Sequence, residues 1–258
     1  MNASNKLLRY LAPAASIGVF ILLWGLISLN VSREFLPSPL DVWNEFVRLC
    51  NARVGGTSIL GHVGYSLRRV LIAFGLAIAL GLPLGLLMGW NRVCEKIVTP
   101  IFEVLRPIPP IAWIPIAILW LGVAEGSKVF ICFVGAFVIM ILNSYTGMRY
   151  VDPLLIDAAK SFGASRSQQF FNVAVPACMP SIFAGVQNAL SMAWMCVLAA
   201  EMVGAREGVG FIIIQGMDLN KPPMILVGMI LIGIIGSFLA ATLRWIEQVL
   251  CPWRRELV

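Results

Sequence analysis

The chain has 258 residues, of which 12% are charged and 59% hydrophobic, and its formal net charge is +6 at pH 7. Soluble domains carry roughly 25% charged residues, and so few charges could not cover this much apolar surface in water. The composition therefore excludes an ordinary soluble enzyme and a disordered chain. It also excludes a nucleic-acid-binding protein, because the positive charges flank apolar segments and do not gather on one face. An all-α polytopic membrane protein is predicted.

Six apolar segments approach the length of about 20 residues that a membrane helix needs. The first is too long for a cleaved signal peptide and is not followed by a small-residue cleavage site. The third is short and rich in proline, so it must extend toward its N-terminal side to cross. The predicted spans are residues 11–30, 67–90, 98–121, 128–148, 181–203 and 222–247. They leave only connections and ends, so residues 1–258 are expected to form one transmembrane domain.

An even number of spans places both ends of the chain on one side of the membrane. Slightly more Lys and Arg residues fall on the side of the ends than on the other side, which favours cytoplasmic ends. Arg68 and Arg69, at the predicted outer mouth of the second span, oppose this orientation. His62 has no metal partner at helical spacing and is expected to be a loop residue without a chemical role.

Glycines four residues apart mark one face of the second span, at Gly81, Gly85 and Gly89, with Pro83 as a predicted kink. Such a face lets another helix approach closely, either within the chain or at a subunit interface. The prolines of residues 106–115 remove backbone donors from the third span. Broken helices of this kind are tolerated where they line a cavity, so the span is a candidate gate, with an ordinary kink as the alternative. Its candidate gate residues are Arg106, Pro109 and Trp113.

Residues 122–128 (GVAEGSK) superficially resemble a phosphate-binding loop. The spacing of the glycines and the order of the last residues are wrong for that motif, so a tight outer turn is predicted and no nucleotide site. The sequence shows no catalytic, cofactor or metal motif. The cysteines are expected to be small apolar fillers of helices without disulfides; they are Cys50, Cys94, Cys132, Cys178, Cys196 and Cys251.

The longest polar segment, residues 149–180, has the signals of two short helices. Asp152 and Pro153 are typical of a helix start, and Gly163 of a helix end. Ser165 and Gln168 form a capping box that starts a second helix, and Pro176 is expected to end it. A helical pair with a sharp bend suits docking on another protein, although an amphipathic connector on the bilayer surface fits the same periodicity.

Polar side chains inside the fourth and fifth spans are candidates for a transport pathway, because polar groups are costly in lipid and face a cavity or a neighbouring helix. Ordinary hydrogen bonding between helices is the alternative. An acidic residue near the outer end of the fifth span, Glu201, is a candidate gate or packing residue with Arg206 or Arg106 as its expected partner. The other candidates are Asn143, Gln187, Asn188, Ser191 and Trp194.

The polar segment resembles the EAA motif of ABC-importer permeases, E-A-A-x3-G-x9-I-x-L-P. It reads Asp157-Ala158-Ala159, then Gly163 after three residues, and Val173-Ala174-Val175-Pro176 after nine more. Asp replaces Glu, and Val replaces Ile and Leu, which leaves the bend intact. Residues 35–40 (FLPSPL), 106–110 (RPIPP), 112–115 (AWIP), 193–194 (AW) and 199–202 (AAEM) are similar to the nitrate, sulfonate and taurine branch of this family.

The resemblance implies a type I ABC importer permease fold with a cytoplasmic coupling helix in the 149–180 loop. It implies a non-catalytic bacterial inner-membrane subunit that binds no cofactor and pairs with a second copy. ATP and Mg would lie on a separate ATPase dimer, and a periplasmic binding protein would deliver a small anion, taurine or another sulfonate first and nitrate as the alternative. A self-contained channel or secondary transporter is a further alternative. The expected coupling residues are Asp157, Ala158, Ala159, Gly163, Ala164, Ser165 and Pro176.

Overall fold

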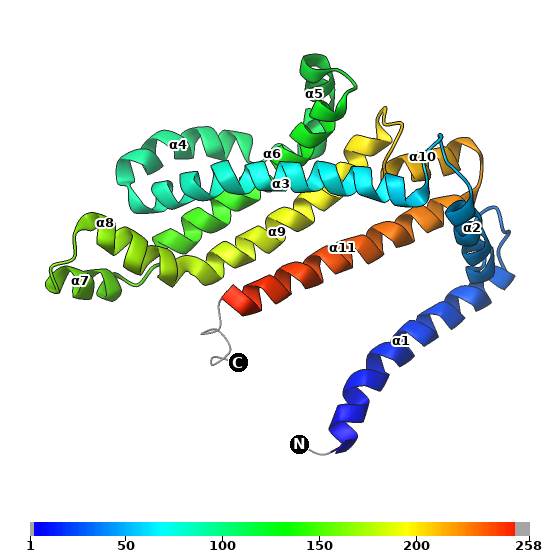
Figure 1. Cartoon of the computed structure of the whole chain (residues 1–258), viewed down its shortest axis with the longest axis horizontal. Coiled ribbons are helices and arrows are strands. Elements are labelled where there is room, and N and C mark those ends of the chain that lie inside the picture. Colours follow the sequence, from blue (N-terminus) through cyan, green and yellow to red (C-terminus); the bar gives the residue numbers. More distant parts are fainter. Residues whose placement is uncertain (1–2, 251–258) are drawn as a thin grey trace.

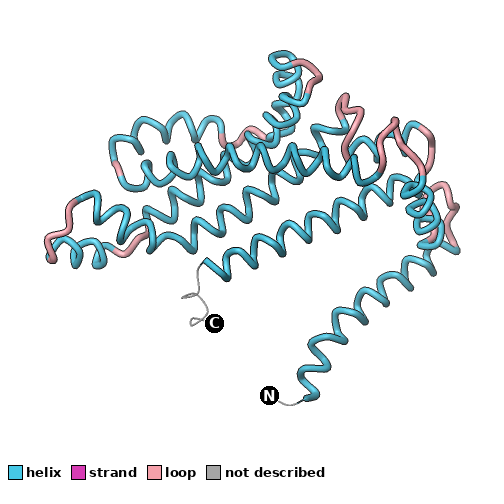
Figure 2. Tube along the Cα trace, viewed as in Figure 1, coloured by secondary structure: helices cyan, strands magenta, loops and turns pink. Residues whose placement is uncertain are grey.

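The computed structural model describes residues 3–250, and the regular elements of this range are helices (Figures 1 and 2). Several are interrupted or joined by short 3-10 or π turns. In chain order they are α1 (Ala3–Leu29), α2 (Pro39–Asn51), α3 (Ile59–Trp90), α4 (Arg92–Leu105), η1 (Pro110–Trp113), α5 (Ile114–Leu121), α6 (Glu125–Arg149), α7 (Pro153–Ser161), α8 (Arg166–Gln168), η2 (Gln169–Ala174), α9 (Val175–Met202), α10 (Val209–Asp218) and α11 (Pro222–Leu250).

Among the described residues, four helices are long and apolar enough to cross a membrane: α3, α6, the continuous helix Arg166–Met202, and α11. The segments Arg92–Leu105 and Pro110–Leu121 make a fifth span if they are counted together, and they are bent by 85° at the prolines between them. The apolar part of α1, Ala15–Leu29, is shorter. The structure thus gives four or five spans, and the count of six stays a prediction.

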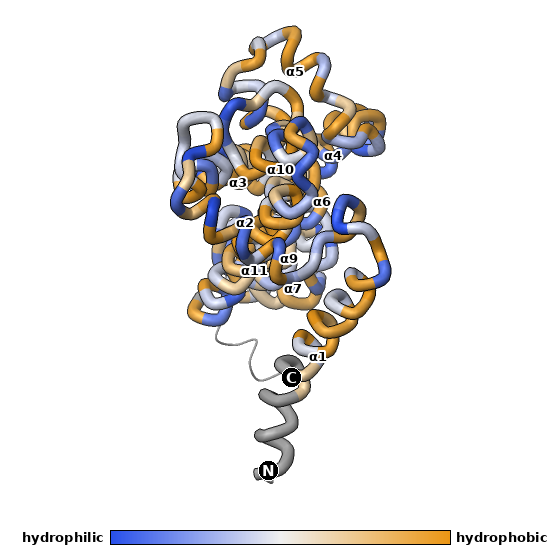
Figure 3. Tube along the Cα trace, turned by 90° about the vertical axis from the view of Figure 1, so that its right-hand side faces the viewer, coloured by the Kyte–Doolittle hydropathy of each residue, from blue (hydrophilic) through white to orange (hydrophobic). Residues whose placement is uncertain are grey.

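The core of the molecule lies where α3, α6 and α9 pack against one another. Small side chains line the contact, and Ala73, Ala77, Ala136 and Ala193 are fully buried there. Helix α1 stands apart from this bundle, with hydrophobic residues along its described part (Figures 1 and 3). Small residues at helix contacts let the backbones approach closely, which is the main source of packing energy between membrane helices.

The glycine face of α3 packs on α6, so of the two interpretations of this face the intrachain one is confirmed. A Cβ atom added at Gly85 would lie 2.6 Å from the carbonyl oxygen of Ile141, and one at Gly89 would lie 2.6 Å from the Cβ of Met148. At Gly81 the nearest atom, the Cβ of Met140, would be 3.1 Å away. The atom that a Cβ at Gly85 would meet belongs to the backbone of α6, which cannot move aside as the end of a flexible side chain can.

Gly85→Ala is therefore expected to destabilise the protein by about 1–3 kcal/mol, the usual cost of overpacking. Gly75→Ala on the same helix is the matched control, because a Cβ there meets nothing within 4 Å. Thermal denaturation of the detergent-purified variants, followed by size-exclusion chromatography, measures the difference. Equal melting temperatures for the two variants would contradict the packing of α3 on α6.

Two boundaries and two connections differ from the sequence prediction. The helix of the second span begins at Ile59, not near residue 67, and α2 and α10 are additional short helices in the connections. Pro176 does not end the second helix of the polar segment, because α8, η2 and α9 run on as one helix through Pro176 and Pro180. The π turn of η2 changes the hydrogen-bond spacing just before Pro176, where the missing N–H is tolerated.

Candidate functional sites

The predicted coupling segment folds as its capping residues indicate. The side chain of Asp152 accepts a hydrogen bond from the backbone N–H of Leu154 at 2.9 Å, and Pro153 opens α7. Gly163 has a φ of +80°, which few other residues adopt, and it produces the bend after α7. Ser165 and Gln168 form the capping box, in which the Ser165 N–H donates to Gln168 Oε1 at 2.8 Å.

This bend lies at one end of the molecule, away from the helix bundle (Figure 1). The expected coupling residues Asp157, Ala158, Gly163 and Ser165 are exposed, and Ala159 and Ala164 are half-buried. Pro176 is exposed on α9. Two apolar side chains beside them are also open to the surroundings, Phe162 with 92% of its surface exposed and Leu154 with 74%.

Four of the five predicted polar pathway residues line one groove, of about 290 Å³, between α9 and α11. The side-chain amide of Gln187 hydrogen-bonds to Glu247 of α11, and the Trp194 Nε1–H donates to the carbonyl oxygen of Ile232 at 3.2 Å. These contacts join the two helices, as the alternative of interhelical bonding predicts. The groove residues of this set are Gln187, Asn188, Ser191 and Trp194.

The fifth residue of the set, Asn143, lies elsewhere. It is on α6, where its amide donates to the carbonyl oxygen of Ile139 at 2.9 Å and its Cβ faces Gly185. The structure therefore places Asn143 in helix packing between α6 and α9, apart from the groove.

The candidate gate residues of the third span lie on both sides of its break. Arg106, at the end of α4, is exposed and forms an ion pair with Glu103 at 3.5 Å. Pro109 precedes η1, and the Trp113 ring packs edge-on against Phe130 with centroids 6.4 Å apart. The Trp113 Nε1 atom is buried and has no hydrogen-bond partner within the described part of the chain.

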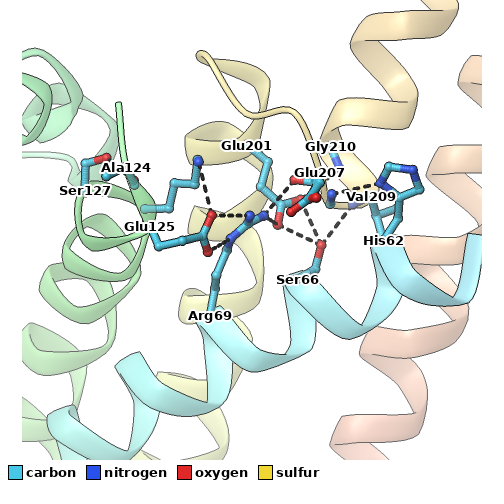
Figure 4. Close-up of polar contacts among 12 residues, drawn as sticks. His62, Ser66, Arg69, Ala124, Glu125, Ser127, Glu201, Glu207, Val209 and Gly210 are labelled. Atoms are coloured by element: carbon cyan, nitrogen blue, oxygen red, sulfur yellow. Dashed lines mark hydrogen bonds and ion pairs between the residues drawn. The ribbon is translucent and has the colours of Figure 1, made fainter. Parts of the chain in front are cut away.

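A largely buried polar network lies where the first half of α3, the start of α6 and the end of α9 meet (Figure 4). We call it the Arg69 network: Ser66, Arg69, Glu125, Lys128 and Glu201. Arg69 is 1% exposed and donates through Nη1 to Glu201 Oε1 at 2.6 Å and to the Glu207 carbonyl oxygen at 2.8 Å. Its Nε and Nη2 atoms donate hydrogen bonds to the two carboxylate oxygens of Glu125, at 2.7 and 2.6 Å.

Glu201 is fully enclosed by donors. Besides Arg69, it accepts hydrogen bonds from the Ser66 hydroxyl at 2.7 Å and from the Gly210 N–H at 2.9 Å. The expected partners Arg206 and Arg106 were therefore wrong. Arg69 is 132 residues away in the chain, and the spacing of residues gives no signal for a pair so distant. A buried carboxylate needs this full set of partners, because an unpaired one is strongly destabilising.

His62 was also predicted wrongly, since it is a fully buried residue of α3 and not a loop residue. Its Nδ1 atom accepts a hydrogen bond from the Gly208 N–H, and Nε2 faces the Val54 carbonyl oxygen, both at 3.0 Å. The ring therefore links the 52–58 loop and the loop between α9 and α10 to the start of α3; Figure 4 shows His62 beside the start of α10.

Residues 122–128 form a shorter turn than predicted. Gly122 has a φ of +69°, and helix α6 begins at Glu125, so Glu125 and Lys128 belong to a helix. Lys128 is 5% exposed, and its Nζ lies 3.4 Å from Glu125 Oε1. The five cysteines of the described range are free, with Cys132, Cys178 and Cys196 buried; Cys251 lies outside that range.

Comparison with known proteins gives one matching family model, the binding-protein-dependent transport system inner membrane component, over residues 81–256. The chain is 34% identical to a putative ABC transporter permease protein of Methanocaldococcus jannaschii over 100% of this chain and 96% of that protein. It is 33% identical to the nitrate import permease protein of Synechocystis (96% and 91%) and 31% identical to the taurine transport system permease protein of Escherichia coli (94% and 90%).

Among solved structures, the fold is similar to a chain of the methionine ABC transporter MetNI in inward-facing conformations. The TM-score is 0.58 at 20% sequence identity, and the match covers 72% of this chain and 95% of that chain. At that identity the likeness concerns the fold alone.

Proposed function

Because this chain belongs to the binding-protein-dependent transport system inner membrane components, and is thus an ABC importer permease without catalysis of its own, we propose that it carries a small oxyanion. The observation behind the proposal is the match over nearly the whole chain to permeases for taurine and for nitrate. Both carry an oxyanion group, the planar nitrate ion or the tetrahedral sulfonate of taurine, which also bears an ammonium group. A sulfonate such as taurine is our first candidate, and nitrate is the alternative that the nitrate import permease supports equally.

Uptake into proteoliposomes tests the substrate. The chain is reconstituted with the ATPase and the binding protein encoded by neighbouring genes, and labelled taurine and nitrate are offered with and without ATP. We expect ATP-dependent accumulation of one of the two anions and none without the binding protein. ATP-dependent uptake of a cation or a neutral solute, with neither anion carried, would contradict the proposal.

We propose that α7 and the bend at Gly163 are the coupling element that docks on a cytoplasmic ATPase dimer. Exposed Phe162 and Leu154 support this assignment, because large apolar side chains that gather on an exposed segment are typical of an interface. The small residues of the bend, among them Ala158 and Gly163, let it enter a groove. ATP and Mg would be bound by the ATPase, and nucleotide binding would favour one of two permease states by differential affinity.

We further propose that two copies of the chain form one pathway. Helix α9 has an open face that carries Ser181, Asn188, Ser191 and Met195 at helical spacing. A second copy facing this stripe would enclose a polar channel without exposing these side chains to lipid. Apolar residues exposed along α1, such as Phe20 and Leu22, offer a further contact for lipid or for the second copy.

In this arrangement the groove between α9 and α11 would open onto the pathway, and the broken third span would act as a gate. The docking bend follows the end of α6, whereas the Arg69 network lies at the start of that 25-residue helix, so the two are at opposite ends of α6. A cytoplasmic bend would therefore put the Arg69 network on the outer side of the inner membrane. Both ends of the chain would then be cytoplasmic, as the even number of predicted spans requires.

A self-contained channel or secondary transporter would move its substrate without a motor. Copurification in detergent separates the two: a coupled permease retains its ATPase through a size-exclusion column, and uptake stops when ATP is withdrawn. Uptake by the reconstituted chain alone would favour the secondary transporter.

A further inference from the structure

A cavity of about 800 Å³ opens beside the Arg69 network, between the turn before α6 and the loop between α9 and α10. Buried cations contribute to its lining. Its charged lining consists of Arg69, Glu125, Lys128, Arg206 and Glu207.

Two of these cations are built into the protein. Arg69 and Lys128 are 1% and 5% exposed, and they come from α3 and α6. Both contact Glu125. Arg69 donates two hydrogen bonds to its carboxylate, and the Lys128 Nζ atom lies 3.4 Å from Glu125 Oε1. A guanidinium fork joined by an ammonium group suits a planar or tetrahedral oxyanion, because the fork donates to two oxygens at once.

The two carboxylates of Arg69 differ in how firmly they are held. Glu201 is 1% exposed and is also bonded to Ser66 and Gly210. The side chain of Glu125 is 54% exposed and lines the cavity, and it contacts Arg69 and Lys128. The Glu125 carboxylate is therefore the ligand that a solute anion can replace, while Glu201 keeps Arg69 in place.

We propose that Arg69 and Lys128 form an anion-binding cradle at this end of the protein, which the Glu125 carboxylate occupies in the resting state. A small oxyanion, such as a sulfonate or nitrate, displaces Glu125 and accepts the same hydrogen bonds. The proposal deepens the proposed function and rests on it: the cradle lies on the side where the binding protein releases its anion. The Glu125 carboxylate then competes with a solute anion and occupies the cradle when no substrate is bound.

Anion binding to the detergent-purified chain tests this without the ATPase. Taurine, nitrate and sulfate are titrated at constant ionic strength, and binding is followed by calorimetry and by the rise in melting temperature. Glu125→Gln removes the competing charge and should tighten anion binding about tenfold, the equivalent of one charged hydrogen bond. Lys128→Gln added to Glu125→Gln should remove most of that gain.

Glu45→Gln is the matched control, because Glu45 also grips an arginine, Arg48, through two hydrogen bonds of 2.7 and 2.5 Å. Arg48 is 47% exposed, and Lys221, the other cation near Glu45, is exposed as well, so this variant should bind anions as the wild type does. Equal affinities for Glu125→Gln, Glu45→Gln and the wild type would overturn the cradle. Should Glu125→Gln not fold, Glu125→Asp, with a shorter reach, takes its place with a smaller gain expected.

A lipid phosphate could offer the same chemistry, so the titration is repeated in nanodiscs of phosphatidylcholine with and without phosphatidylglycerol. We expect the soluble anions to bind in both; binding of phosphatidylglycerol alone would overturn the proposal. Loss of the cradle with intact anion uptake would leave the proposed function standing. A cradle that binds anions in a protein that transports none would contradict only the proposed function.

Discussion

Replacing Arg69 by leucine should lower the free energy of unfolding by about 3–5 kcal/mol, the usual cost of leaving a buried charge without its partner. The substitution strands Glu201, which is 1% exposed, and removes the link from α3 to α6 through Glu125. Unfolding in mixed detergent–SDS micelles measures the loss.

The matched control is Arg48→Leu, because Arg48 also pairs with a carboxylate, that of Glu45 on α2, but is itself 47% exposed where Arg69 is 1% exposed. Water can replace Arg48 at this half-buried pair, so this variant should lose clearly less than Arg69→Leu. The double variant Arg69→Leu with Glu201→Leu should regain a large part of the loss, because Glu201 then no longer leaves an unpaired buried charge and Lys128 keeps its partner Glu125. An Arg69→Leu protein as stable as Arg48→Leu would show that the network does not support the fold.

Gly163→Leu should uncouple transport from ATP hydrolysis while insertion and folding stay intact. The φ of +80° at Gly163 is unfavourable for leucine by about 1–2 kcal/mol, so the bend after α7 changes direction. A Cβ at Gly163 meets nothing within 4 Å, so the packed core is not disturbed. We expect anion uptake to fall about tenfold or more, with ATPase activity no longer stimulated by the loaded binding protein. Parallel measurements of uptake and ATPase activity in proteoliposomes provide the test.

Gly56→Leu controls for backbone strain, because Gly56 has a φ of +88° and also meets nothing within 4 Å. It lies in the loop before α3, far along the bundle from α7. This variant should transport normally. Wild-type uptake by Gly163→Leu, or an equal loss in both variants, would mean that the bend has no special role in coupling.

The sequence by itself determined the features that depend on neighbouring residues. The long apolar runs became α3, α6, α9 and α11, since hydrophobic length alone decides whether a helix suits a membrane. Asp152, Gly163 and Ser165 set the ends of α7 and α8, because a cap uses only groups within one helical turn. The spaced EAA pattern identified the family for the same reason, since it is written along one short segment.

The tertiary structure alone decided which distant groups meet. Arg69 and Glu201 are 132 residues apart, and the sequence near either residue does not indicate that the other is its partner. His62 was buried by loops that fold back over the start of α3. Glu125 and Lys128, which were predicted to lie in an outer turn, line a charged cavity. Such contacts depend on how helices pack, and the packing energy comes from whole faces rather than from any local signal. The long apolar helices and the helix caps are thus determined by local sequence, whereas the pairing of the buried charges is decided only by the tertiary structure.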